Sequence, residues 1–190
     1  MLLIALLAPQ DPSALDAAVR AVPGMDLQKL RPAEDAAFLQ RLSADLRGAG
    51  PSDAEAKAFA EDKAPDKRRR KVDELLGSPS FAAHWGRRLS TRLIGPPGEY
   101  RIGLAGLKPE AERAIEGRFV EWMTAQIAAD RPWTGIVRAM IEARGESGKL
   151  PELAYKLGTA GRDWPTRDFA LDVSRHFVGV RLYCATCHDH

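Results

Sequence analysis

The sequence has only two cysteines among its 190 residues, and both lie in the last seven positions, at Cys184 and Cys187. Two cysteines three positions apart do not form a disulfide framework, and this spacing is typical of a local metal, haem or redox site. The sequence also lacks any apolar run approaching the ~20 residues that a membrane-spanning helix needs. We therefore expect neither a disulfide-rich scaffold nor a membrane span in this chain.

The chain also lacks a dominant charge of one sign. Its 28 basic and 26 acidic residues give a formal net charge of +2, which does not predict a nucleic-acid partner. One basic run, at residues 67–71, is flanked by Asp66, Asp73 and Glu74, so we interpret it as a solvated helix face. An apolar content of 45% with 28% charged residues is typical of a globular protein with a core of its own.

Familiar catalytic motifs are missing as well. No Gly-x-Ser-x-Gly, His-Glu-x-x-His or dinucleotide-binding fingerprint occurs. Residues 145–149 resemble the end of a phosphate-binding loop, but Ala143 stands where the first glycine belongs and Leu150 where a serine or threonine belongs. A hydrolase acting on an extracellular polymer would need a carboxylate pair, which the sequence does not position. A redox or binding domain without catalysis is therefore favoured over an enzyme.

Apolar residues recur at helical spacing almost throughout, so we predict an all-α, irregular domain of about seven helices. Ser52 and Glu55 form a capping-box pattern, and Gly77 is expected to end a helix in the left-handed conformation. The Gly- and Pro-rich residues 95–108 form a loop and a possible internal boundary. The expected helices cover residues 33–47, 52–61, 66–76, 79–93, 109–129, 133–144 and 166–181, with a short helical piece at 153–157.

The first 29 residues are expected to lie outside the helical domain, which we place at residues 30–190. Residues 1–8 (MLLIALLA) are apolar but have no preceding basic residue, and Pro9 follows them. We interpret this segment as the remnant of a signal peptide, the alternative being a flexible N-terminal segment. Because haem attachment takes place outside the cytoplasm, we expect an exported protein of the periplasm or cell envelope.

The motif Cys184-Ala185-Thr186-Cys187-His188 is the most informative feature of the chain, because Cys-x-x-Cys-His is the attachment signature of c-type haem. In such a site the two thiols bind the haem vinyl groups, and the histidine gives an axial nitrogen to the iron. The predicted final helix leads directly into this motif. The sequence thus predicts covalent haem c binding for electron transfer, with a redox partner protein.

Other chemistries suit the same residues. Two thiolates with the imidazoles of His188 and His190 could bind zinc, although structural zinc sites usually draw their ligand pairs from separated segments. A thioredoxin-like redox pair lacks its βαβ context. A disulfide or two free thiols at a helix end is also possible. The alternative function is therefore a zinc-stabilised or metal-free helical interaction module in which the Cys/His cluster is structural.

The sixth coordination position of a haem iron distinguishes electron transfer from ligand binding, and the sequence does not identify its occupant. His190 cannot easily reach the far side of a ring that His188 already binds. The other histidines and methionines lie upstream at spacings that favour packing or surface positions over ligation. They are Met25, His84, Met123, Met140 and His176.

Several separated segments and the C-terminal motif resemble segments of one known family and occur in the same order. They are residues 35–48, 65–68, 75–81, 84–85, 119–122, 130–133, 172–182 and 184–190. In these segments the chain resembles the planctomycete-type cytochrome-associated domain of unknown function 1549, from about residue 30 to residue 190. The resemblance implies a large exported protein with a separate cytochrome c domain before this one and another domain after it.

By the same resemblance, Cys184, Cys187 and His188 are the candidate haem residues, and His190 belongs to the recurrent motif. The chain departs from the family pattern because the residues that usually follow the motif are missing. We therefore expect a domain truncated at its C-terminal motif.

Overall fold

The computed structural model describes residues 17–18, 20–23, 32–95, 108–146, 149–159 and 165–183. This part of the chain contains eight α-helices followed by a π-helical turn, and no strand, which confirms the all-α prediction. The elements are α2 (Asp35–Arg47), α3 (Asp53–Glu61), α4 (Lys67–Leu76), α5 (Pro79–Ile94), α6 (Pro109–Ala128), α7 (Trp133–Glu142), α8 (Leu153–Thr159), α9 (Pro165–Val173) and η4 (Ser174–Val178).

The helix bounds follow the sequence signals with two exceptions. Gly77 ends α4 with φ −79° and ψ 0°, and so does not adopt the left-handed conformation expected of it. The final helix ends at Val178 instead of Arg181, and its last turn is π-helical. The predicted loop at residues 95–108 lies outside the described residues apart from its two ends, as does nearly all of the N-terminal segment 1–29.

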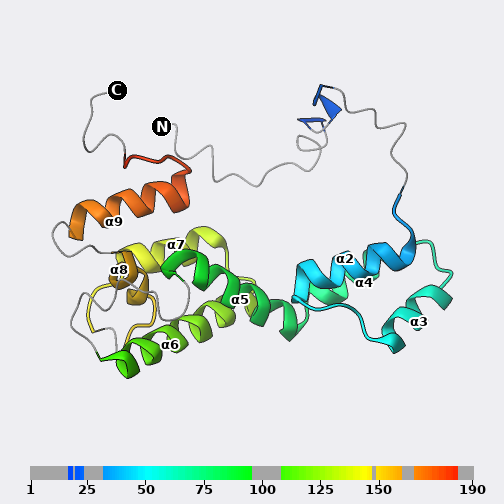
Figure 1. The fold of residues 1–190 in the computed structure, drawn as a ribbon, viewed down its shortest axis with the longest axis horizontal. Coiled ribbons are helices and arrows are strands. Elements are labelled where there is room, and N and C mark those ends of the chain that lie inside the picture. Colours follow the sequence, from blue (N-terminus) through cyan, green and yellow to red (C-terminus); the bar gives the residue numbers. More distant parts are fainter. Residues whose placement is uncertain are drawn as a thin grey trace.

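Helix α5 is central to the fold because it packs against helices of two groups (Figure 1). Helices α2 and α4 pack against α5, and α3 packs against α2. Helices α6 and α8 also pack against α5, with α7 and α9 packed against α8. We call α2–α4 with the start of α5 the N-terminal half, and the end of α5 with α6–α9 and η4 the C-terminal half. None of the described helices is long and apolar enough to cross a membrane.

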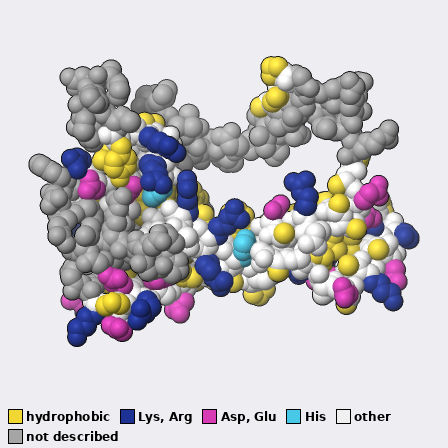
Figure 2. Space-filling view, viewed as in Figure 1, with side chains coloured by type: hydrophobic (Ala, Val, Ile, Leu, Met, Phe, Trp, Pro, Cys, Tyr) yellow, Lys and Arg dark blue, Asp and Glu magenta, His cyan; other side chains and the backbone are white. Residues whose placement is uncertain are grey.

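Charged side chains join the helices of the N-terminal half. Asp35 at the start of α2 forms ion pairs with Lys67 and Arg68 of α4, the latter at 2.7 Å between Oδ1 and Nη2. Arg70 binds Asp62 at 2.7 Å between Nη2 and Oδ2. Several basic residues of the run 67–71 therefore form ion pairs with other segments, and the run is not a fully solvated face. Figure 2 shows basic and acidic side chains interspersed on this side of the molecule.

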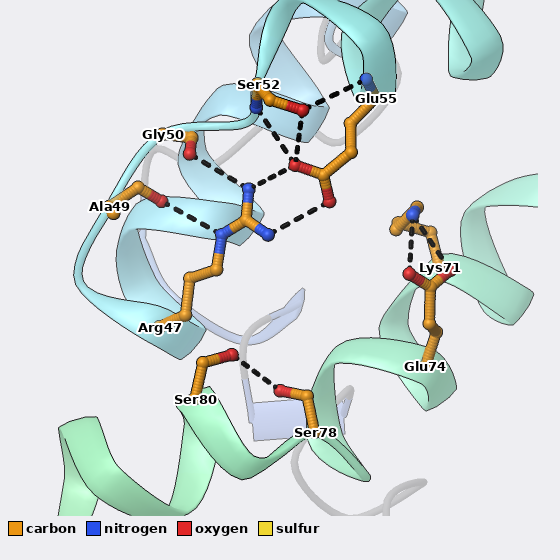
Figure 3. Close-up of polar contacts among 9 residues, drawn as sticks. All are labelled: Arg47, Ala49, Gly50, Ser52, Glu55, Lys71, Glu74, Ser78 and Ser80. Atoms are coloured by element: carbon orange, nitrogen blue, oxygen red, sulfur yellow. Dashed lines mark hydrogen bonds and ion pairs between the residues drawn. The ribbon is translucent and has the colours of Figure 1, made fainter.

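A second charged contact, which we call the clamp, connects Arg47 at the end of α2 to Glu55 in α3 (Figure 3). Arg47 donates two hydrogen bonds to the Glu55 carboxylate, at 2.9 and 2.8 Å, and one to the carbonyl oxygen of Gly50, at 2.9 Å. Glu55 also accepts from the backbone N–H of Ser52, whose hydroxyl accepts from the Glu55 N–H. The capping box predicted from the sequence is thus confirmed, and the arginine extends it across to the preceding helix.

Apolar side chains hold the C-terminal half together. Phe119, Met123, Met140, Ala154 and Tyr155 have no exposed surface, and they share one core with the end of α5. Helices α5 and α6 approach closely at Gly86, where a Cβ atom would lie 2.8 Å from the Cα of Thr124. This core supports α9, whose apolar side chains pack on it through Phe169 and Val173.

Candidate functional site

The predicted site residues Cys184, Cys187, His188 and His190 lie outside the described residues, which end at Tyr183. The haem or metal site at these four residues therefore stays a prediction, and the described residues nearest to it in the sequence belong to the last helix and the five residues after it. That helix consists of α9 and η4, and it lies over α8 at the end of the chain drawn in orange and red in Figure 1.

The last turn of this helix has a wider geometry than the turns before it. At Ser174–Val178 the chain is π-helical, and Gly179 ends the helix with φ 76°. The carbonyl oxygen of Ser174 accepts from the N–H groups of Gly179 and Val180, while its hydroxyl donates to the Val180 carbonyl oxygen at 3.0 Å. Left-handed backbone of this kind favours glycine, so the helix ends at a defined position. π-Helical turns are rare and frequently occur at functional sites.

After the helix, the chain is fixed to α9 by a polar contact. The Tyr183 hydroxyl donates to Oδ1 of Asp172 at 3.3 Å, and Arg175 lies 4.0 Å from the same oxygen. Asp172 is only 5% exposed, so its carboxylate needs such partners. This contact holds Tyr183 beside α9, and Tyr183 immediately precedes Cys184 in the sequence.

A buried tyrosine and a histidine form the second polar contact of this region. The Tyr155 hydroxyl lies 3.2 Å from Nδ1 of His176, and Tyr155 itself has no exposed surface. Tyr155 comes from α8 and His176 from the π-helical turn, so the contact ties these two elements together. Buried tyrosine hydroxyls need a hydrogen-bond partner, and here the imidazole provides one.

Aromatic rings surround this pair. The Tyr155 ring centroid lies 5.9 Å from that of Phe169 and 5.4 Å from that of Phe177. Trp133 of α7 packs on Phe177 at 6.2 Å. Aromatic pairs at these separations stabilise the packing beyond the effect of buried area alone. The His176 ring therefore packs against the rings of Tyr155 and Phe177, with centroid separations of 6.0 and 6.1 Å.

Burial and neighbouring charges shift the pKa values of both partners. Burial, followed by the negative charge of Asp172, raises the pKa of the Tyr155 hydroxyl. Burial also lowers the pKa of His176, although Asp172 opposes this effect. At neutral pH the pair is thus a neutral phenol and a neutral imidazole. A neutral imidazole is the form that binds metals.

The comparison with known families decides which family this architecture represents. The PSCyt2 family model, described as a protein of unknown function (DUF1549), matches residues 15–190. The chain belongs to this family. DUF1549 is a cytochrome-associated family of planctomycetes, so the resemblance seen in the sequence is confirmed. No curated protein and no solved structure matches the chain.

Two of the other candidate ligands of this DUF1549 domain are closed to a cofactor. The side chains of Met123 and Met140 have no exposed surface and belong to the core. His84 packs against Gly48 at the end of α2, where its Nε2 is buried without a hydrogen-bond partner. Met25 lies outside the described residues. Within the described residues, no three His, Cys, Asp or Glu side chains are grouped as a metal site.

Three residues of the site were not found from the DUF1549 sequence: Tyr155, Asp172 and Tyr183. Asp172 and His176 stand four positions apart, beside the apolar positions Phe169, Val173 and Phe177 of the same helix. Polar residues at helical spacing next to an apolar stripe indicate a polar contact at the edge of a core. That pattern would have pointed to Asp172. Tyr155 and Tyr183 are identified only by the folded structure.

Proposed function

We propose that this DUF1549 domain binds haem c covalently through Cys184 and Cys187, with His188 as the residue that would bind the iron, and acts in electron transfer. The donor set fits the group, because it has two thiols and one imidazole in the order that haem attachment requires. When bound, haem c supplies an iron that accepts and releases one electron. The polar tie between Tyr183 and Asp172 carries the proposal.

This tie matters because a covalent cofactor must be held in a fixed environment for its potential to be defined. Asp172 lies on a helix that packs on the C-terminal core, and Tyr183 connects that helix to the first cysteine. The contact thus fixes the residue that precedes the motif in the sequence. The aromatic rings of Phe169, Phe177 and Trp133 pack in this region and are partly exposed.

The proposal includes export and a protein partner. Export to the periplasm or cell envelope is supported by the apolar residues 1–8 and by the place where haem attachment occurs. Val178, Val180, Leu182 and Tyr183 are between 38% and 46% exposed just before the motif. Exposed apolar side chains near a redox group suit transient contact with a redox partner, which belongs either to another domain of a longer protein or to a separate protein.

The test is the absorbance spectrum and intact mass of the chain, made with an added export signal in a periplasm that contains haem-attachment machinery. We expect the reduced-minus-oxidised spectrum of a c-type haem and a mass increased by one covalent haem. Changing both Cys184 and Cys187 to Ala removes both signals. The matched control is Lys149→Ala, which alters an exposed side chain and leaves both signals in place.

A colourless protein of unmodified mass would contradict the proposal. In that sample, zinc should be measured by metal analysis and the thiols counted. Bound zinc lost on chelation, together with a loosened fold, would support the alternative of a zinc-stabilised interaction module that uses Cys184, Cys187, His188 and His190. Reduced or disulfide-bonded cysteines without metal would support a metal-free module.

A further inference from the structure

We infer that three arginines of helix α5, Arg87, Arg88 and Arg92, form a docking surface for an acidic face of the redox partner protein. The redox role of that partner rests on the proposed function, and the inference adds the chemistry of the surface that binds here. In the sequence the densest positive charge lies instead at residues 67–71. The folded chain reverses this order, because it pairs the charges of that run and leaves those of α5 exposed.

The basic residues 67–71 are largely neutralised within the fold. Each of the five forms an ion pair with a nearby Asp or Glu, and Lys67 and Arg68 share Asp35 of α2. A charge that already has such a partner must give it up before it binds another protein. The run that stands out in the sequence therefore stabilises the fold.

The arginines of α5 lack such partners. The side chains of Arg87, Arg88 and Arg92 are exposed, and none of them forms an ion pair within the part of the chain that the structure describes. The sequence explains this, because no acidic residue occurs between Glu74 and Glu99. Helix α5 thus has three arginines and no carboxylate of its own.

The three side chains lie close together. Arg88 and Arg92 are four positions apart, so they share one face of the helix and are separated by about 6 Å along its axis. Arg87 is the neighbour of Arg88. The guanidinium group of Arg88 lies over the Trp85 ring, 5.2 Å from the ring centroid. This cation–π contact restrains the arginine, which lowers the entropy lost when it binds a carboxylate.

The positive charge of α5 also acts on the end of the last helix. Burial is the main cause of the lowered pKa of His176, and the charges of Arg175 and Arg92 lower it further, although Asp172 opposes them. Figure 2 shows basic side chains between the two histidines coloured cyan, and no acidic side chain is visible among them in this view. The arginines of α5 are therefore part of a positive region that extends to the π-helical turn.

Exposed apolar side chains near this region favour a protein partner over a nucleic acid. Val178, Val180 and Leu182 follow His176 and are between 40% and 46% exposed. Protein interfaces combine apolar contacts with complementary charge, and arginine is enriched in them. Nucleic-acid binding depends instead on a strong basic field, which a net charge of +2 does not provide.

The experiment titrates the full chain with poly-glutamate, a probe for a carboxylate-rich protein surface, and follows the arginine Nε–H signals by nuclear magnetic resonance. We expect the signals of Arg87, Arg88 and Arg92 to move, and poly-glutamine of the same length to leave them in place. Changing all three arginines to Gln should weaken binding about tenfold, because three exposed charge pairs of ordinary strength together give this factor.

The matched control removes the same amount of charge elsewhere. Arg113→Gln, Arg138→Gln and Lys149→Gln are combined in one chain, since each of these exposed residues already has an acidic neighbour in its own segment. This variant should change the affinity for poly-glutamate less than about twofold. Equal weakening by the two triple variants would show that only net charge matters, and would overturn the inference.

Other outcomes also decide. Absence of poly-glutamate binding, or tighter binding of duplex DNA or of phosphatidylglycerol vesicles, overturns the assignment to an acidic protein. If the triple arginine variant does not fold by circular dichroism, Arg87→Gln combined with Arg92→Gln decides, because it keeps the contact of Arg88 with Trp85. Haem-loaded protein that does not bind the probe overturns this inference alone. Colourless protein that binds it through these arginines overturns the proposed function and leaves the acidic partner.

Discussion

Around the first half of α5, charged side chains join α2, α3 and α4, whereas around its second half a continuous apolar core joins α5 to α9. In the N-terminal half, a small group of buried apolar residues that includes Leu39 and Phe59 is bordered by these ion pairs. In the C-terminal half the buried polar side chains include Tyr155 and Asp172, which contact His176 and Tyr183, respectively, at and just after the end of the last helix.

The polar groups of the two halves therefore have different partners. The carboxylates of Asp35 and Glu55 are bound by basic side chains of neighbouring helices, so they hold the fold together. The imidazole of His176, in contrast, forms a hydrogen bond with the buried Tyr155 at the end of the helix that precedes the motif. The proposed cofactor site thus follows the C-terminal half in the sequence, whereas the ion pairs of the N-terminal half join its helices.

The largest effect is expected from Phe119→Ala, which removes a fully buried ring from the C-terminal core. A cavity of this size should lower the free energy of unfolding by about 3–5 kcal/mol. Phe59→Ala in the N-terminal half should cost less, because Phe59 retains 6% exposure and lies beside Lys67, where water can fill the space. Urea unfolding followed by circular dichroism measures both. Equal losses would show that the two halves do not differ in this way.

The next largest effect is expected where α5 and α6 approach each other. In Gly86→Ala the new Cβ would lie 2.8 Å from the Cα of Thr124, a backbone atom that cannot move without shifting the helix. Overpacking of this kind should cost about 1–3 kcal/mol. Thermal unfolding should show the loss, and a variant as stable as the unaltered protein would mean that the two helices are farther apart than described.

A smaller effect is expected from breaking the clamp between α2 and α3. Glu55→Gln removes the charge that Arg47 binds, and should cost about 1–2 kcal/mol at neutral pH. The control is Glu61→Gln on the same helix, whose exposed pair with Lys57 at 4.0 Å should contribute almost nothing. Equal effects of the two substitutions in urea unfolding would contradict the structural role of the clamp.

The same carboxylate gives a pH dependence. Hydrogen bonds from Arg47 and then from Ser52 lower the pKa of Glu55 from 4.5 to about 2. Glu55 has a lower pKa in the folded state than in the unfolded state. Its ionised carboxylate therefore stabilises the fold fully above about pH 4.5, and this stabilisation is lost as the pH falls towards 2. The stability difference between the unaltered protein and Glu55→Gln should therefore narrow over this range. A difference that stays constant from pH 5 to pH 2 would argue against the clamp.

The smallest effect is expected to be a gain in stability. Gly117 lies within α6 on the exposed side, and a Cβ added there meets nothing within 4 Å. Gly117→Ala should therefore stabilise the protein by up to about 1 kcal/mol, because alanine favours the helical backbone. Together with Gly86→Ala, it makes a matched pair of the same substitution with opposite signs. A loss of stability at Gly117 would indicate a contact on this face that the fold does not show.

The sequence predicted helices best where local signals decide their ends. Ser52 and Glu55 specified the start of α3, and Pro79 the start of α5. The last helix was less predictable, because its apolar positions continue to Val180 while the backbone widens at Ser174 and stops at Gly179. That stop depends on hydrogen bonds made by the Ser174 carbonyl and hydroxyl groups, which periodicity does not reveal.

The covalent part of the proposed site stays a prediction from the sequence, and the contacts of the helix before it were not predicted. The spacing of Cys184, Cys187 and His188 predicts a chemistry directly, because the motif is contiguous in the chain. Tyr155 and His176 are 21 positions apart, and their contact follows from how α8 packs beneath the last helix. Contacts of that kind depend on tertiary packing, so a single sequence gives no spacing rule for them.

The most direct test of the central claim is to locate the haem within the chain. Trypsin cleaves after Arg181, so the peptide that begins at Leu182 contains both cysteines and His188. Mass spectrometry of the periplasmically produced protein should find one haem on that peptide, which would place the cofactor at the end of the C-terminal half. An unmodified peptide from the same preparation, or haem on any other peptide, would contradict the account.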